Sequence, residues 1–296
     1  MIDQQDLAAQ FGEKPEKPEK PWQATARMFY TNKAAVFGLI GFLIVILLGL
    51  FGPIIFGADP FDIAGKPLME PQDANPLGTD YLGRDILSGV IYGARPTMII
   101  AITATVCATV IGISIGAIAG FYGGKIDNFL MRFTEFFQVL PSLVFAMVIV
   151  AVFEPSFLIV VLAIGTTTWT PLARLARAEF LKIKEREFVL AARALGAQNI
   201  RLILRVILPN ALPPLIIAIT LRVGTTIIFE AALSFLGLTD PSIMTWGRMI
   251  GLSRDYFFEA WWTVTFPGLA ILFTALFIAL IGDGLNDAFN PKLRRR

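Results

Sequence analysis

Long blocks of apolar residues alternate with shorter polar segments along most of the chain. Six blocks reach the roughly 20 helical residues that are needed to cross a hydrocarbon layer of about 30 Å. We therefore predict an all-α fold, a polytopic membrane bundle of six transmembrane helices. Pro141 falls inside the third helix, where neighbouring helices can compensate for the lost backbone hydrogen bond. The predicted helices occupy residues 34–56, 94–121, 129–153, 156–177, 211–236 and 263–285.

The polar segments divide the chain into regions. The expected regions are an N-terminal tail (1–33), a first transmembrane helix (34–56), an outer segment (57–93), a five-helix core (94–285) and a C-terminal tail (286–296). The first apolar block begins too late and runs too long for a signal peptide, whose apolar region has about 7–15 residues, so we expect it to be retained. Residues 22–33 combine aromatic and basic side chains, which favours a short amphipathic helix on the membrane surface.

The Lys and Arg residues fall mostly on one side of this arrangement. With the N-terminus inside, 19 of the 25 lie in cytoplasmic segments and five in outer segments. Basic residues are enriched in cytoplasmic loops, so this bias selects the orientation. We therefore expect both termini in the cytoplasm, and Trp261 and Trp262 fit an aromatic belt at the outer interface.

The composition agrees with a membrane protein and excludes several kinds of chemistry. Hydrophobic residues make up 55% of the chain and charged residues 16%, against about 45–50% and 25% in soluble domains. The sequence contains no histidine, which excludes His-based metal sites and Ser-His-Asp triads. Its single cysteine, Cys107, cannot form an intrachain disulfide. We expect a protein that is not an enzyme, with no catalytic residue, metal or cofactor.

A phosphate-binding loop of the form G-x-x-x-x-G-K-[ST] is also absent from the sequence. The nearest match is Gly124-Lys125, but Ile126 replaces the hydroxyl residue and Ala119 replaces the leading glycine. The chain therefore does not hydrolyse ATP itself. If it works in an ATP-driven device, the motor is a different polypeptide.

The inside segment at 178–210 is the most informative part of the sequence. Residues 187–195 are helix formers and small alanines, and Gly196 suits a helix end because glycine tolerates a left-handed backbone. A second amphipathic run follows at 199–208. This pattern predicts a basic helix-turn-helix that projects into the cytoplasm, where the small alanines let another protein approach closely.

This segment resembles the EAA loop of bacterial ABC importer permeases, whose pattern is E-A-A, three residues, G, nine residues and I-x-L-P. The spacing matches throughout, although Leu190 stands for Glu and Val206 for Ile. In the family, the loop docks on the ATPase subunit and couples its closure to channel opening. The resemblance implies an ATPase-coupling loop formed by Leu190, Ala191, Ala192, Gly196, Val206, Leu208 and Pro209.

Two further stretches narrow the family. Residues 75–95 resemble the P-L-G-T-D-x-x-G-R-D…G-A-R signature of the C-type permeases of dipeptide, oligopeptide and nickel systems. Residues 230–247 resemble the E-A-x-L-S-F-L-G…W-G stretch of the same subunits. Asn75 replaces a common His and Gly89 a frequent Arg, and neither change indicates a substrate.

The resemblance implies a MetI-like permease core of five helices, preceded here by one more. Such a subunit forms a heterodimer with a second, related permease. The subunit lies in the bacterial inner membrane, where it also binds two ATPase subunits and receives solute from a substrate-binding protein. The implied function is half of the translocation path of an ATP-driven importer. Relatives handle dipeptides, oligopeptides, nickel or other small solutes, so the substrate stays open, with peptides favoured.

Two charged residues fall inside the fifth predicted helix. Arg222 lies at membrane depth, and Glu230 follows eight residues later on roughly the same helical face. Charges at this depth usually face the bundle interior or a water-filled cavity. Both are therefore candidates for the translocation path. Arg222 is expected to face either the path or the partner subunit, and a structural ion pair with an acid on a neighbouring helix is the alternative for it. Glycines at 112, 116 and 120 favour close helix packing.

Two other classes of protein compete with this interpretation. An ion-driven secondary carrier often shows internal repeats, broken helices and intramembrane acids, and here no repeat is visible and buried acids are few. A membrane enzyme needs converging nucleophiles, bases or metal ligands, and the sequence offers no such group of residues. Dependence of transport on ATP and a partner discriminates the carrier from the importer.

Overall fold

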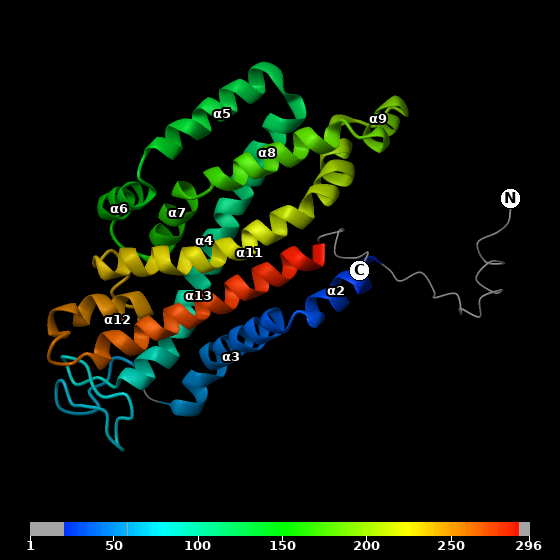
Figure 1. Ribbon diagram of the computed structural model, residues 1–296. Coiled ribbons are helices and arrows are strands. Elements are labelled where there is room, and N and C mark those ends of the chain that lie inside the picture. The colour runs from blue at the N-terminus through cyan, green and yellow to red at the C-terminus, as the bar shows by residue number, and fades with distance from the viewer. Residues whose placement is uncertain (1–20, 58, 290–296) are drawn as a thin grey trace, which may run out of the picture.

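The computed structural model describes residues 21–57 and 59–289, and this part of the chain is built almost entirely of helices (Figure 1). Apolar helices alternate with polar connections, the longest of which joins α3 to α4. The helices are α2 (Pro21–Thr31), α3 (Lys33–Phe56), α4 (Ile86–Tyr122), α5 (Gly124–Val139), α6 (Ser142–Phe153), α7 (Phe157–Thr167), α8 (Thr170–Lys184), α9 (Glu187–Ala194), α10 (Asn199–Arg201), η1 (Leu202–Ile207), α11 (Leu208–Phe235), α12 (Trp246–Ser253), η2 (Arg254–Tyr256) and α13 (Trp262–Phe289).

The long helix α4 organises the bundle. It contacts α3, α5, α7, α8, α11, α12 and α13, and in Figure 1 it crosses behind α11 and α13. Its closest neighbour is α8, because Gly112, Gly116 and Gly120 lie so near α8 that an added Cβ would come within 3 Å of it. The glycine spacing is therefore used for close packing, as small residues are in other membrane helices.

Between four and six stretches of the described residues are long and apolar enough to cross a membrane, and the predicted six is the upper end of this range. Within the described residues, α3, α4, α13 and the continuous stretch Asn199–Phe235 are long and apolar enough to cross alone. Two bent pairs complete the set, because α5 with α6 and α7 with α8 each pass the same test together. Their bends of 83° and 46° mark broken spans or re-entrant loops.

The breaks correct two of the predicted helices. The range 129–153 is interrupted at Leu140 and Pro141, because proline has no N–H and disfavours helical backbone at the residue before it. The range 156–177 is interrupted at Thr168, whose hydroxyl bonds back to the carbonyl of Ile164 at 2.8 Å. Such back-bonding competes with the helix and bends it.

The helix boundaries also differ from the hydropathy pattern. Helix α4 begins at Ile86 rather than at 94, because Asp85 caps it by accepting a hydrogen bond from the Ser88 N–H at 2.7 Å. The predicted helix at 22–33 is formed as α2, which packs against α3 and α13. Residues 1–20 and 290–296 of the two predicted tails lie outside the described residues.

Residues 59–85 and 237–261 meet over one end of the bundle, and we call them the cap. The ring of Tyr81 stacks on that of Tyr256 with centroids 5.5 Å apart. Two buried indoles fasten the cap to the helices: Trp246 donates to the Val90 carbonyl at 2.8 Å, and Trp262 donates to the Thr79 carbonyl at 3.2 Å. In Figure 1 the cap lies at the opposite end of the bundle from α9 and α2.

Candidate functional site

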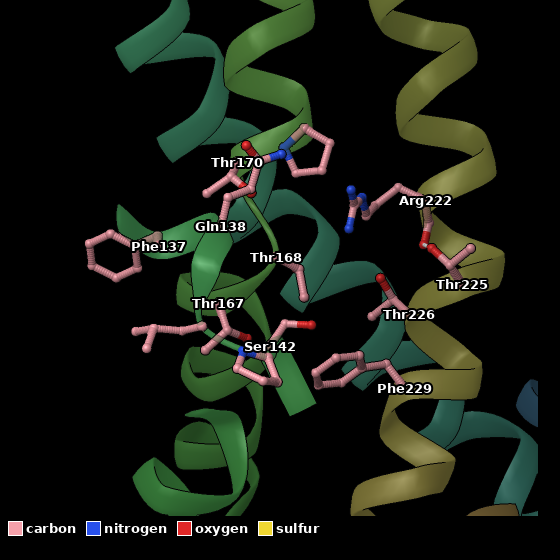
Figure 2. A pocket seen from close by; sticks show the side chains of 13 residues that line it. Phe137, Gln138, Ser142, Thr167, Thr168, Thr170, Arg222, Thr225, Thr226 and Phe229 are labelled. Carbon is pink, nitrogen blue, oxygen red and sulfur yellow. Dashed lines mark hydrogen bonds between the residues drawn. The ribbon is translucent and has the colours of Figure 1, made fainter. Parts of the chain in front are cut away.

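The two helix breaks and α11 border a half-open cavity of about 350 Å³, which we call the central cavity. Its walls come from the α5–α6 break, the α7–α8 break and the middle of α11 (Figure 2). The lining residues are Phe137, Gln138, Leu140, Pro141, Ser142, Thr167, Thr168, Thr170, Pro171, Arg222, Thr225, Thr226 and Phe229.

Arg222 supplies the charge in this cavity. Its side chain extends from α11 towards the α7–α8 break and faces Thr168 and Thr170 (Figure 2). It is half-buried. No hydrogen bond or ion pair joins its guanidinium to any residue that the structure describes. The structural ion pair considered for Arg222 is therefore not formed within this part of the chain.

Hydroxyl groups make up most of the remaining polar lining. Thr225 donates to the Arg222 carbonyl at 2.9 Å, and the hydroxyls of Thr226 and Thr105 lie 3.1 Å apart across α11 and α4. A hydroxyl has one hydrogen and two lone pairs, so these groups can bind water or a solute as well. The hydroxyls of Ser142 and Thr170 have no hydrogen-bond partner among residues 21–57 and 59–289.

Glu230 lies away from the central cavity, nearer the cap. Its side chain is fully buried, and its Oε1 accepts a hydrogen bond from the Ser234 hydroxyl at 2.6 Å. The Thr245 hydroxyl, at the start of α12, lies 3.4 Å from that of Ser234. Glu230 Oε2 has no partner within the described chain. The structure thus places only Arg222, of the two charged residues predicted for the path, in the cavity wall.

Residues 178–210 form the predicted helix-turn-helix, which we call the EAA-like loop. Helix α9 ends at Ala194, and Gly196 follows with φ of +84°, in the left-handed region that glycine adopts without a steric penalty. The N–H of Gly196 donates to the Arg193 carbonyl, and that of Ala197 donates to the Ala192 carbonyl. These bonds close the end of α9 and turn the chain towards α10.

The EAA-like loop leaves large apolar side chains uncovered. Leu195 is 89% exposed and Ile200 59%, and Phe188 and Leu204 are also exposed. Sequence reasoning missed these four residues. The sequence does carry a sign of them, because the short helices of the loop have apolar residues on two faces and only one face can be buried. Leu202, for example, is buried, whereas Leu204 is exposed. These four side chains make the loop a candidate contact surface.

The residues of the EAA motif divide between this surface and the interior. Leu190, Ala191 and Pro209 are exposed, whereas Ala192, Val206 and Leu208 are half-buried beside a core cluster. That cluster joins α8, α9 and η1 through buried Phe180, Val189, Leu202, Ile203 and Ile207. The loop is therefore braced against the bundle.

One continuous helix connects the EAA-like loop to the central cavity. The stretch Asn199–Phe235 runs through α10, η1 and α11 without a break. In η1 the helix widens, and the Leu208 N–H donates to the Ile203 carbonyl five residues back. Pro209 supplies no N–H, and the Asn210 side chain instead donates to the Val206 carbonyl at 2.6 Å. Wide turns of this kind are frequent at functional sites.

An ion pair fixes α5 to α8 beside the loop. Arg177 Nε and Nη2 donate to the two oxygens of Asp127 at 2.5 and 2.6 Å, and Asp127 is buried. This two-bond geometry is the strongest that an arginine and a carboxylate make. Farther along α5, Gln138 accepts from Arg174 at 3.1 Å. Sequence reasoning missed this pair, because its members lie 50 residues apart.

Comparison with known proteins gives consistent results over most of the chain. Residues 112–295 match the family described as "Binding-protein-dependent transport system inner membrane component", and residues 20–76 match "N-terminal TM domain of oligopeptide transport permease C". The di/tripeptide transport system permease protein DppC of Pseudomonas aeruginosa is 39% identical, over 92% of this chain and 91% of that protein. The oligopeptide transport system permease protein OppC of Bacillus subtilis is 36% identical, over 93% and 90%.

A solved structure supports the same fold. A chain of an inward-facing structure of the MetNI methionine ABC transporter superimposes with a TM-score of 0.59. The match covers 69% of this chain and 98% of that one, at 16% sequence identity. At this identity the likeness concerns the fold alone, and it agrees with the MetI-like core that the sequence predicts.

Proposed function

The chain belongs to the ABC importer permeases of the binding-protein-dependent transport family, in the branch of the dipeptide and oligopeptide permeases, and on this basis we propose that it forms half of a translocation path for peptides. Members of this family are multi-pass inner-membrane proteins that work with a partner permease and with ATPase subunits. We propose two ATPase subunits for this assembly, and a substrate-binding protein that delivers di- or oligopeptides.

The continuous helix Asn199–Phe235 carries the proposal. It begins in the EAA-like loop, where apolar side chains are uncovered, and it holds Arg222 in the wall of the central cavity. At 1.5 Å per residue, about 35 Å of helix separate Asn199 from Arg222. Although Pro213 and Pro214 remove two backbone N–H groups from it, the helix is continuous, and in this proposal it transmits a displacement at the loop to the cavity, which is what coupling of ATP hydrolysis to transport needs.

In this proposal the seven EAA residues have three kinds of role. Leu190, Ala191 and Pro209 contact the ATPase subunit directly, together with the exposed Leu195. Gly196 makes the tight turn, and the half-buried remainder connects the contact surface to the cluster beneath it. The small side chains of α9 allow the partner surface to approach closely.

The orientation follows from the charge bias. We propose that the EAA-like loop and both termini face the cytoplasm and that the cap faces outward. The arrangement in Figure 1 supports this, since α2, the end of α13 and α9 lie at one end of the bundle and the cap at the other. Arg222 then lies inside the path, whereas the buried Glu230 stabilises the outer end of α11.

Purification from the native host tests the proposal. A tagged chain extracted in mild detergent is expected to bring down a second permease and ATPase subunits, with ATP hydrolysis in the same sample. A variant with residues 187–209 scrambled is expected to lose the ATPase subunits and to keep the partner permease. The proposal is wrong if the unaltered chain purifies alone and vesicles that contain it accumulate peptide without ATP.

A further inference from the structure

We infer that Arg222 binds the free carboxylate of the passing solute, so that the central cavity is a transient carboxylate site within the path. This inference rests on the proposed function and names the chemical feature of the solute that the cavity takes. It also discriminates between the substrate classes that the sequence leaves open.

The first argument is the missing partner of Arg222. Among the described residues, Arg177 binds Asp127, and Arg248 binds the carbonyls of Pro241 and Ile243, whereas none supplies Arg222 with an acceptor. An unpaired cation at membrane depth carries a large free-energy penalty, so such residues persist where they have a function. A planar guanidinium presents paired donors that match the two oxygens of a carboxylate.

The second argument is the composition of the cavity wall. Its 13 lining residues include no Asp or Glu, so no carboxylate of the wall competes for Arg222. Opposite the guanidinium lie Thr168 and Thr170 (Figure 2). The Thr168 hydroxyl already donates to the Ile164 carbonyl, whereas the Thr170 hydroxyl has no partner among the described residues and can donate to a bound oxygen. A single positive charge without nearby acids attracts an anion and repels a free metal cation.

The third argument is the shape and polarity of the remaining wall. The volume of about 350 Å³ falls in the range of small-molecule sites. Phe137, Leu140 and Phe229 provide apolar contact without specific hydrogen bonds. One fixed anion site beside an apolar wall suits a class of solutes that share a carboxylate and differ in their side chains. Peptides with a free C-terminus have this chemistry, and free nickel ions do not.

A charge-restoration experiment tests the inference in the assembled transporter in vesicles. Arg222 is replaced by Cys in a chain that also carries Cys107→Ser, so that the new thiol is the one that reacts. Uptake of a dipeptide with a free C-terminus is then measured in the presence of ATP. The Cys variant is expected to transport about tenfold more slowly, the effect of losing one charged hydrogen bond. Reaction with an aminoethyl thiosulfonate, which adds a cation, is expected to restore transport, and reaction with a methyl thiosulfonate is not.

A second measurement uses the same peptide with an amidated C-terminus. The preference for the free acid over the amide is compared between Arg222→Gln and the unaltered transporter, so that discrimination by the binding protein cancels. The preference is expected to fall about tenfold in Arg222→Gln and to stay unchanged in Arg95→Gln, an exposed arginine of α4 outside the cavity.

Two results would overturn the inference. Either the two thiol reagents restore transport equally, or Arg222→Gln slows the acid and the amide by the same factor. Failure of the proposed function would look different, because the unaltered transporter itself would then take up no peptide with ATP.

Discussion

The cap and the EAA-like loop, at opposite ends of the bundle, are built in contrasting ways. In the cap, polar groups are buried and bonded: Asp80 Oδ1 accepts the N–H groups of Leu82 and Arg84 at 2.8 and 2.9 Å. In the EAA-like loop, apolar groups are exposed, and Leu195 reaches 89%. Satisfied buried polar groups hold a segment in one conformation. The cap is therefore held by bonds within this chain, although it also exposes Phe258 at 98% and leaves Arg84 Nε and Asp85 Oδ1 without a partner among the described residues. For the loop, we propose that another protein covers the exposed apolar side chains.

If the two ends differ in this way, the largest loss of stability is expected for Trp246→Ala in the cap. Trp246 is 2% exposed and loses both its packing and its bond to Val90. We expect the free energy of unfolding to fall by about 3–5 kcal/mol, measured by denaturation of the purified chain in detergent. Leu195→Ala in the loop is the matched change, with an expected effect below about 0.5 kcal/mol. Equal losses in the two variants would contradict the comparison.

A smaller loss of stability is expected from breaking the ion pair between Asp127 and Arg177, which fixes α5 to α8 near the EAA-like loop. Asp127→Asn weakens the ion pair with Arg177 and leaves the guanidinium without a countercharge. We expect a loss of about 1–2 kcal/mol, less than for a fully buried pair because the Arg177 side chain is 35% exposed. The exchange Asp127→Arg with Arg177→Asp is expected to recover part of the stability. No recovery would mean that the pair contributes little beyond the packing of each residue.

The substitution Ala191→Lys tests whether the exposed surface of the EAA-like loop docks the ATPase subunit. A long charged side chain on this exposed position obstructs a docked ATPase subunit without touching the core. We expect ATP-dependent uptake to fall about tenfold, equivalent to about 1.4 kcal/mol, and the melting temperature to stay unchanged. Asn128→Lys, exposed on α5 at the same end, is the control and is expected to transport normally. Equal uptake by both variants would count against the docking surface.

The smallest expected effects are changes of stability with pH, and two acidic residues of the cap, Asp80 and Asp240, are expected to act in opposite directions. Burial raises the pKa of Asp80 above its ordinary value of 3.8, against the opposing hydrogen bonds from Arg84 and Leu82. The folded state therefore holds this proton more tightly than the unfolded state, and the contribution of Asp80 to stability falls as the pH rises from 3.8 through the raised pKa. Asp80→Asn keeps an oxygen for both bonds and is expected to be more stable than the unaltered chain above that window.

The pKa of Asp240 is shifted in the opposite direction from that of Asp80. The Ser242 hydroxyl, which donates to it at 2.5 Å, lowers the pKa of Asp240. Its contribution is present above its ordinary value of 3.8 and is lost as the pH falls through the lowered pKa. Asp240→Asn is thus expected to be less stable at pH 7 and to match the unaltered chain in strong acid. Melting curves from pH 2 to 7 measure both acids, and parallel curves for the two variants would refute this assignment.

The sequence predicts the apolar stretches that can span a membrane, the helix-turn-helix and the family, because these depend on local hydropathy and on fixed spacing. It does not predict the break at Leu140, since proline inside a membrane helix is often accommodated without one. The central cavity forms where two breaks meet α11, and the Asp127–Arg177 pair joins distant segments. Such features depend on tertiary packing. The shared helical face of Arg222 and Glu230 likewise failed to predict that only one of them lines the cavity.

The most direct test of the coupling helix is an insertion of three glycines between Ile207 and Leu208. This change keeps both the loop surface and the cavity but removes the rigid connection between them, because glycine weakens a helix by about 1 kcal/mol per residue. The same insertion between Asp73 and Ala74, both exposed in the cap, is the control. We predict that the ATPase subunits still bind and hydrolyse ATP while peptide uptake per ATP falls at least tenfold. Uptake per ATP equal to that of the control would contradict coupling through this helix.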